Sequence, residues 1–296
     1  MAPWRLAFIA LLLALSIPVS AQISQATASG TAAPVLSQEQ IRQLIRRAAE
    51  RDIENDKQSS NYTYIESAEE HKLDGNGRAN STESRTYDVM ALYGEQVRRL
   101  IAKDDHPLSA KDAAKEEDKI QKLIEKGKNE SENDRRKRLE KEDKEREEGR
   151  EFVKEIVDAY NFHLAGMANL EGRSSYVIDA DPRPGYEPRG KNAKFLPKFR
   201  FRVWIDRAEE EWVKVDIQCI ETASVGLFLV RVHQGSNIQI EQTQVNGEVW
   251  LPKHVALKLD ARILFKGLNV QSDVTYRDYK KFRTDTKIVP VGEAQR

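Results

Sequence analysis

The chain has 296 residues, of which 32% are charged, and its formal net charge at pH 7 is zero. Because no basic excess is available to neutralise phosphates, this balance argues against a nucleic-acid partner. The single cysteine, Cys219, excludes an internal disulfide, and its place in the run VKVDIQC predicts a small buried side chain.

The first residues, MAPWRLAFIALLLALSIPVSAQ, have the pattern of an export signal. One arginine precedes an apolar run from Leu6 to Ile17, and the small residues up to Ala21 are typical of a signal-peptidase site. The run has about 12 residues, whereas spanning a bilayer takes ~20. We therefore predict a signal peptide at residues 1–21, cleaved after Ala21, and an exported chain with no integral membrane span after cleavage.

Residues 22–37 are small, polar and interrupted by Pro and Gly, so they predict a flexible leader. A helix is expected at 38–55, because Ser37 and Gln40 have the spacing of a capping box. One face of this helix is apolar, formed by Ile41, Leu44, Ile45 and Ala48.

Two extended runs flank Asp74-Gly75-Asn76-Gly77, which is a strong hairpin signal. A third extended run at Glu95–Lys103 follows Gly94, and Pro107 closes the segment. The region after the first helix therefore predicts three antiparallel strands.

Residues 103–151 differ in kind, because 15 of these 49 residues are Lys or Arg and 17 are Asp or Glu. Apolar residues are not sustained at heptad spacing, which argues against a coiled coil. The pattern predicts a solvated helix with i,i+4 ion pairs, broken near Gly127–Asn133; a dedicated protein-binding arm is the alternative. An apolar stripe then returns and should dock on the core: Phe152, Val153, Ile156, Val157 and Tyr160.

The rest of the chain consists of short extended runs separated by turn signals. We expect strands near 161–168, 174–181, 198–206, 211–221, 225–234, 237–246, 249–261 and 263–279, which gives about eleven with the three earlier ones. This spacing predicts a meandering antiparallel sheet or barrel. A two-sheet sandwich would show the same alternation, as would a curved sheet with helices in its concave face. The few amphipathic helices favour the curved sheet.

The sequence offers no catalytic signature. The five histidines are scattered, and no zinc-protease, paired-cysteine, nucleophile-elbow or phosphate-loop motif is present. We therefore predict no catalytic residue, no metal and no cofactor.

Several phrases resemble one protein family when they are taken together. They are VRRLIAKDDHPLS, YVIDADPRPGY, FRFRVWIDRAEEEWVKVDIQ, GEVWLPKHVALKLDARIL and VTYRDYKKF. They resemble the LolA/LolB-like periplasmic lipoprotein-carrier superfamily, especially outer-membrane lipoprotein-sorting-like proteins, and the related N-terminal domain of the regulators RseB and MucB. The resemblance covers most of 38–108 and 150–285 and leaves out 109–149.

This resemblance implies a mainly β fold with helices (α+β): an incompletely closed antiparallel β-barrel with lidding helices. It implies a single domain at 38–288, interrupted by a charged helical insertion at 109–149 (the charged arm), with a C-terminal tail at 289–296. It also implies a periplasmic, non-catalytic carrier for acyl chains or lipid-modified proteins in a Gram-negative bacterium. An RseB-like sensor or protein-interaction module, with another envelope protein on the charged arm, is the alternative; an enzyme with a hydrophobic site is less favoured.

The strand FRFRVWID at 199–206 has one apolar face, and side chains alternate between the faces of a strand. With the resemblance, this face is expected to line a lipid cavity or to seat the helical lid, whereas Trp204 and Asp206 lie on the opposite face. The candidate ligand-cavity residues are Phe199, Phe201, Val203, Ile205, Val213, Val215, Ile217, Leu227, Leu229, Ile238, Ile240, Leu257 and Leu259.

Overall fold

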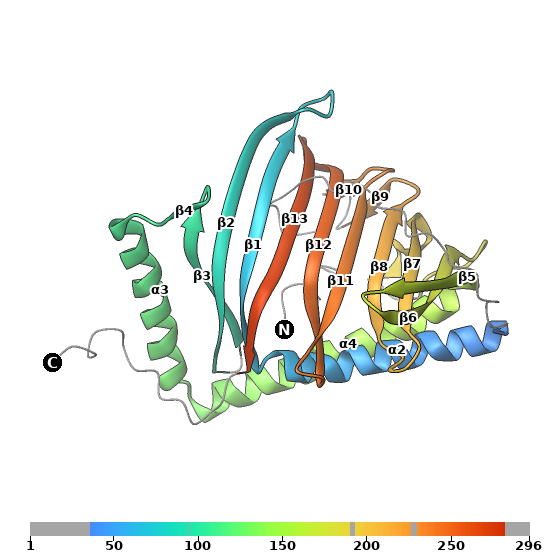
Figure 1. The fold of residues 1–296 in the computed structure, drawn as a ribbon, viewed down its shortest axis with the longest axis horizontal. Helices are drawn as coiled ribbons and strands as arrows, with labels where there is room; N and C mark the ends of the chain where they lie inside the picture. Colours follow the sequence, from blue (N-terminus) through green and yellow to red (C-terminus); the bar gives the residue numbers. More distant parts are fainter. Residues whose placement is uncertain (1–35, 94, 190–192, 226–229, 282–296) are drawn as a thin grey trace.

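A computed structural model describes residues 36–93, 95–189, 193–225 and 230–281. The predicted signal peptide, most of the leader and the predicted tail lie outside this part of the chain. The described residues form one large antiparallel sheet and three long helices, with a short 3-10 helix (η2, Leu196–Lys198) before the central strands (Figure 1).

The main path of the sheet contains eleven strands in the order β4-β3-β2-β1-β13-β12-β11-β8-β7-β6-β5. Its two end strands pair on one side only, so the sheet is not closed. The predicted fold class, an incompletely closed antiparallel β-structure with helices, is confirmed. The strands are β1 Tyr62–Leu73, β2 Ala79–Leu92, β3 Glu95–Lys103, β4 His106–Pro107, β5 Tyr160–Leu170, β6 Arg173–Pro182, β7 Phe199–Asp206, β8 Trp212–Cys219, β11 Asn237–Val245, β12 Val249–Ile263 and β13 Lys266–Lys281.

Two further short strands, β9 Ala223–Val225 and β10 Val230–Val232, lie beside the upper end of β12. The run predicted at 225–234 corresponds to this pair. The candidates Leu227 and Leu229 fall between the two strands and lie outside the described residues.

The predicted hairpin between the first two strands is confirmed. The Asp74 carboxylate accepts hydrogen bonds from the backbone N–H groups of Asn76 (2.8 Å) and Arg78 (2.9 Å), which closes the turn. Gly77 has φ +75°, a conformation that L side chains rarely adopt, so glycine is needed there.

Helix α2 (Gln38–Ser59) begins where the capping box predicted and ends four residues later than expected. The Ser37 hydroxyl accepts from the Gln40 N–H (3.2 Å), and the Gln40 side chain accepts from the Ser37 N–H (2.8 Å). Its apolar stripe faces the sheet, where it meets β5, β8 and β12, and α2 runs beside the long helix α4 (Figure 1).

The charged arm forms two helices, α3 (Ala110–Lys128) and α4 (Glu132–Ala159), and the break between them lies in the predicted region. Ion pairs three or four residues apart run along both helices, such as Lys122–Asp118 at 2.6 Å. The predicted stripe at the end of α4 docks on the core: Val157 and Tyr160 are buried, and Phe152 and Ile156 pack against buried residues.

The core lies between the helices and the strands from β5 to β11. Aromatic side chains anchor it: the Tyr160 hydroxyl donates to the backbone carbonyls of Leu196 (2.5 Å) and Phe199 (3.0 Å), and its ring lies 4.7 Å from that of Phe201. The buried members are Ile41, Leu44, Ala48, Ala159, Tyr160, Phe162, Ile178, Ala180, Ala193, Leu196, Phe199, Phe201, Ile205, Val215, Ile217, Cys219, Ala223, Val232, Ile238 and Ile240.

Replacing Ile205 by Ala should destabilise the fold by about 2–5 kcal/mol, because this fully buried side chain would leave a cavity in the core. Urea unfolding at neutral pH measures the change. Phe265→Ala is the control, since Phe265 is 91% exposed and its loss should change the free energy of unfolding by less than about 0.5 kcal/mol. Equal effects of the two substitutions would contradict this description of the core.

Candidate functional site

The candidate site is the apolar face of the sheet beneath α2. Ten of the thirteen predicted residues belong to it. Seven are buried in the core cluster: Phe199, Phe201, Ile205, Val215, Ile217, Ile238 and Ile240. Three are partly buried and pack against that cluster: Val203, Leu257 and Leu259.

Strand register joins these residues into rows that cross the sheet. One row runs Phe201, Ile217, Ile238 and Leu257, from β7 through β8 and β11 to β12. The next row is longer and crosses six strands, from β7 to β1: Val203, Val215, Ile240, Val255, Val274 and Ala68. The apolar surface is therefore continuous from strand to strand.

Helices cover part of this surface. Ile41, Leu44 and Ala48 of α2 belong to the same buried cluster as the strand residues. Between α4 and β7, Phe195 lies 6.0 Å from the ring of Phe152 and 5.8 Å from that of Phe199. The apolar face of FRFRVWID was expected either to line a lipid cavity or to seat the helical lid. In the described residues this face packs against helices. Its role in ligand contact stays a prediction.

Among the described side chains, hydrogen bonds hold α2 to the sheet from Arg47 onward. The Arg47 guanidinium binds the Glu210 carboxylate with two hydrogen bonds of 2.7 and 2.9 Å, which lowers the pKa of Glu210. The Asn55 amide bonds the backbone of Trp250, accepting from its N–H at 2.8 Å. Gln96 donates to the Ser59 carbonyl (3.2 Å). Before Arg47, apolar contacts hold the helix to the sheet.

Beyond β12 the same face also carries polar side chains, beside Val274 and Ala68 of the longer row. Glu66 on β1 lies beside Tyr276 on β13 and pairs with Arg98 of β3 at 3.0 Å. Glu66 is buried, and burial raises the pKa of its carboxyl, although Arg98 opposes this shift. The face is thus apolar at β7, β8, β11 and β12 and carries buried charge at β1. The sequence pattern did not indicate that Glu66 and Arg98 would form an ion pair.

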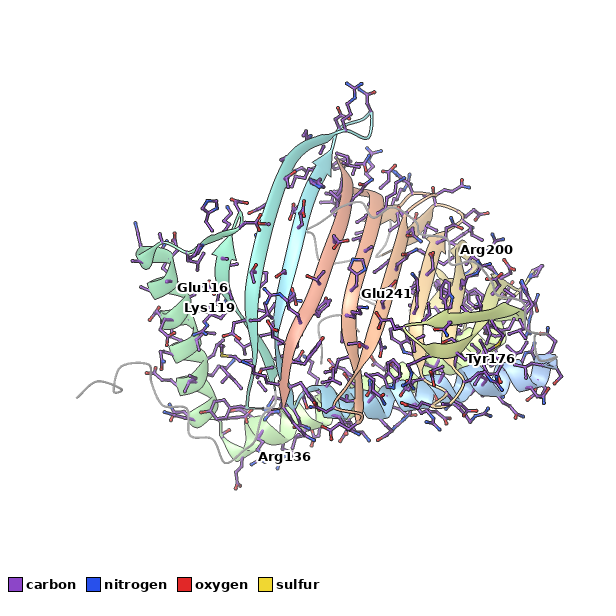
Figure 2. All side chains as sticks on the ribbon, viewed as in Figure 1. Glu116, Lys119, Arg136, Tyr176, Arg200 and Glu241 are labelled. Carbon is purple, nitrogen blue, oxygen red and sulfur yellow. The ribbon has the colours of Figure 1, made fainter. Side chains whose placement is uncertain are left out.

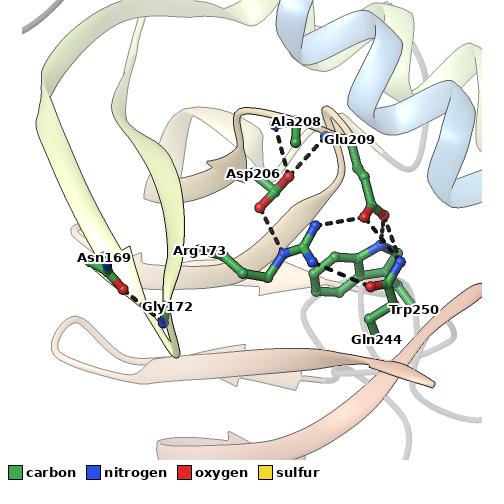
Figure 3. Close-up of polar contacts among 8 residues, drawn as sticks. All are labelled: Asn169, Gly172, Arg173, Asp206, Ala208, Glu209, Gln244 and Trp250. Carbon is green, nitrogen blue, oxygen red and sulfur yellow. Dashed lines mark hydrogen bonds and ion pairs between the residues drawn. The ribbon is translucent and has the colours of Figure 1, made fainter. Parts of the chain in front are cut away.

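A second polar cluster, which sequence reasoning missed, joins the lower ends of three hairpins (Figure 3). Arg173, at the start of β6, donates to Asp206 (2.9 Å), Glu209 (2.6 Å) and Gln244 (3.3 Å). Its guanidinium also lies 5.0 Å from the centre of the Trp250 ring. These residues come from the β5–β6, β7–β8 and β11–β12 hairpins, so no local pattern could have brought them together.

Trp250 and Gln244 complete this cluster by donating to Glu209, with Trp250 Nε1 at 2.8 Å. Asp206 was expected only on the face opposite the apolar residues, yet it is 2% exposed and sits next to buried Ile205. The register shift at this point places its extra residue, Val213, in β8, whereas β7 pairs with β6 without a break, so Asp206 stays on the face opposite Ile205 and is buried there. Burial alone would raise the pKa of Asp206, but hydrogen bonds from Arg173 and from the backbone N–H groups of Glu209 and Ala208 outweigh it and lower that pKa.

A cavity of about 330 Å³ lies beside the Arg173 cluster. Arg173, Val213 and Trp250 line it, together with Lys214 and Glu241, which form an ion pair at 2.7 Å. The candidate Val213 therefore lines this mixed polar and apolar cavity and is not a member of the core cluster. In Figure 2, Glu241 lies in the central part of the sheet, well away from α3.

The described residues give no support for chemistry at these sites. They contain no group of three His, Cys, Asp or Glu side chains that could hold a metal ion. Cys219 is buried as predicted, and burial raises the pKa of its thiol, so it is a poor nucleophile. Among the same residues, no helix has the length and apolar character to cross a membrane.

No family model and no curated protein matches the chain. Similar solved structures include an outer membrane lipoprotein-sorting protein domain from Vibrio parahaemolyticus, with 11% identity, 82% of this chain and 95% of that chain covered, and a TM-score of 0.35. A LolA superfamily protein from Nitrosomonas europaea has 9% identity, covers 84% and 94% of the two chains, and has a TM-score of 0.27.

The complex of MucA and MucB from Pseudomonas aeruginosa is a third similar structure, with 10% identity, coverage of 81% and 99%, and a TM-score of 0.22. These neighbours include the superfamily that the sequence phrases resemble.

Replacing Asp206 by Asn should lower the free energy of unfolding by about 1–3 kcal/mol at pH 7, because a buried charged acceptor of Arg173 is lost. The folded-state pKa of Asp206 is depressed, so its contribution is present above the unfolded pKa of about 3.9 and is lost as the pH falls through the folded pKa. The difference from the wild type should therefore shrink below about pH 4.

Urea unfolding from pH 7 down to pH 2 measures this dependence. Asp278→Asn is the matched control, because Asp278 is exposed and pairs only with the neighbouring Arg277 among the described ion pairs. Asn also tolerates the positive φ of position 278. A deficit of Asp206→Asn that stays constant over the whole range would show that the charge of Asp206 is not what stabilises the cluster.

Proposed function

We propose that the protein is an exported, non-catalytic binding protein that holds an acyl chain, free or attached to a protein, on the apolar face beneath α2. The observation that carries this proposal is the six-strand apolar row from Val203 to Ala68, part of which is covered by a helix. Since the described polar contacts hold that helix from Arg47 onward, its first turns, before Arg47, can lift while the rest stays attached.

The free energies favour replacement of the first turns of α2 by an acyl chain. Lifting these turns returns Ile41 and Leu44 to water, at a cost of about 1.5–3 kcal/mol for each side chain. Each CH₂ group of an acyl chain that takes their place contributes ~0.8 kcal/mol, so about ten groups contribute ~8 kcal/mol. A chain of ordinary fatty-acid length can therefore replace the helix, whereas a short apolar metabolite cannot.

The change of polarity along the face supports an amphiphilic ligand. The apolar rows lead toward β1, where the buried Glu66 carboxylate pairs with Arg98. An acyl chain on the rows would place its polar end near this pair. A ligand that is apolar throughout would leave the charges of Glu66 and Arg98 facing hydrocarbon, which is unfavourable.

The proposed setting is the periplasm. It is supported by the signal-peptide pattern at residues 1–21, and lipoprotein sorting is the process named for one of the similar structures. A carrier in an aqueous compartment must shield the acyl chain from water and still release it. A helix held partly by apolar contact meets both needs, because a membrane or second carrier can compete for the same chain.

The purified protein should bind a fluorescent fatty acid, and native mass spectrometry with lipid extraction should detect lipid that co-purifies from a Gram-negative host. Leu257→Gln should weaken fatty-acid binding about tenfold or more, because a polar amide would lie on the partly buried margin of the apolar row. The thermal midpoint identifies a variant that loses binding only because it unfolds.

Thr275→Gln is the control for this experiment, since Thr275 is exposed on the neighbouring strand β13 and belongs to neither apolar row. It should leave fatty-acid binding unchanged. The proposal fails if no lipid co-purifies and the fluorescent fatty acid does not bind the folded protein. It also fails if Leu257→Gln, while folded, binds as well as the wild type.

A further inference from the structure

The two edges of the open sheet differ in how their backbone groups are covered. A free edge carries a row of N–H and C=O groups that can pair with another chain, and proteins usually block it with charges, proline, bulges or a covering element. In this sheet β3 and β4 form one edge and β5 forms the other (Figure 1).

The β3 edge is covered by the charged arm. Helix α3 packs against β3, and two of its side chains bond the edge backbone: the Glu116 carboxylate accepts from the Leu100 N–H (3.1 Å), and Lys119 donates to the Arg98 carbonyl (3.3 Å). Both side chains lie on α3 facing this edge in Figure 2. The short strand β4, which ends in Pro107, covers the end of β3.

Helix α2 packs against β5, but among the described residues no hydrogen bond like those of Glu116 and Lys119 bonds the β5 backbone at its free edge. The sequence of β5, YNFHLAGMANL, contains no Lys, Arg, Asp, Glu or Pro, in a chain that is 32% charged. The described backbone hydrogen bonds of β5 lead to β6 alone. One blocking feature is present, a register shift at Ala165, where Gly166 has φ +154°.

A row of charged and ionisable side chains crosses the sheet and ends at β5, the open edge. Strand register aligns Asp216, Arg202, Asp179 and His163 across β8, β7, β6 and β5. Arg202 binds Asp179 through hydrogen bonds of 2.5 and 2.7 Å, and His163 lies 3.5 Å from the same carboxylate. The signs alternate from Asp216 through Arg202 to Asp179, and His163, whose side chain is 53% exposed, ends the row at the open edge.

We propose that β5 binds an extended segment of another protein as a twelfth strand on the main path of the sheet, with an acidic residue of that segment opposite His163. The imidazole can donate a hydrogen bond to a carboxylate, and an acidic residue continues the alternation of charge. On the other face, the neighbouring Phe162 and Leu164 belong to or pack against the core, so the flanking residues of the segment should be apolar.

A second copy of this chain fits the edge less well than such a segment. If two β5 strands paired about a two-fold axis, each would offer the other a strand with no carboxylate, whose one ionisable side chain besides the buried Tyr160 is histidine. Neither strand could then supply the carboxylate that continues the row. This inference does not depend on acyl binding, because β5 pairs through its edge and the apolar rows lie on the face.

The test uses labelled peptides of about nine residues that alternate Val and Thr and carry either Glu or Lys at the centre. Fluorescence anisotropy gives their affinities for the purified protein, and amide hydrogen exchange locates the contact. The Glu peptide should bind about two- to fivefold more tightly than the Lys peptide and slow exchange along β5. His163→Gln should remove this preference, and Ala165→Lys should weaken both peptides at least tenfold.

Thr275→Lys is the matched control, because it adds the same charge at an exposed position of β13, a strand that is paired on both sides. Light scattering measures the mass of the free protein. The proposal is overturned if neither peptide slows exchange in β5, or if folded Ala165→Lys binds them as the wild type does. It is also overturned if the protein forms a dimer that Ala165→Lys dissociates, since the occupant would then be a second copy.

Discussion

The packing of α2 on the apolar rows is the interaction on which the rest of the structure depends. An antiparallel sheet with one apolar face must bury that face, and this sheet is open, so it cannot do so by closing on itself. Ile41, Leu44 and Ala48 provide the cover together with the end of α4. Because α2 and α4 lie side by side, removal of either helix would expose strand residues that the other covers only in part.

The polar clusters determine which end of this cover is fixed. Arg47 and Asn55 attach α2 to Glu210 and Trp250, and Trp250 in turn belongs to the Arg173 cluster. The fixed end of the helix therefore rests on the point where three hairpins are joined, the part of the sheet with the most cross-linking polar contacts. The other end rests on apolar side chains, whose attraction is non-directional and is replaced without loss by another apolar group. The proposed lifting of the first turns of α2 depends on this difference between its two ends.

Much of the fold follows from local patterns, whereas the polar sites do not. The capping box located the start of α2, the DGNG turn located the first hairpin, and alternation along FRFRVWID identified Phe199, Phe201 and Ile205 as inward-facing. These features depend on neighbours in sequence. The Arg173 cluster and the Glu66–Arg98 pair join residues that are 32 to 71 positions apart, so their formation depends on strand register. Alternation placed Asp206 on the opposite face but could not indicate that it is buried there, because its partners Arg173 and Glu209 come from other parts of the chain or from the following turn.

The charged arm shows that helices can be predicted from composition while the contacts they make with the sheet are not. Its sequence indicated a solvated helix with ion pairs, and two such helices are present. Nothing in that pattern indicated that Glu116 and Lys119 would bond the backbone of β3, since a charged side chain on a helix usually faces water. Among the described residues, these two contacts cover the β3 edge and leave β5 as the edge whose backbone groups are bonded by no element other than β6. A strand added to this sheet would therefore find its backbone partners at β5.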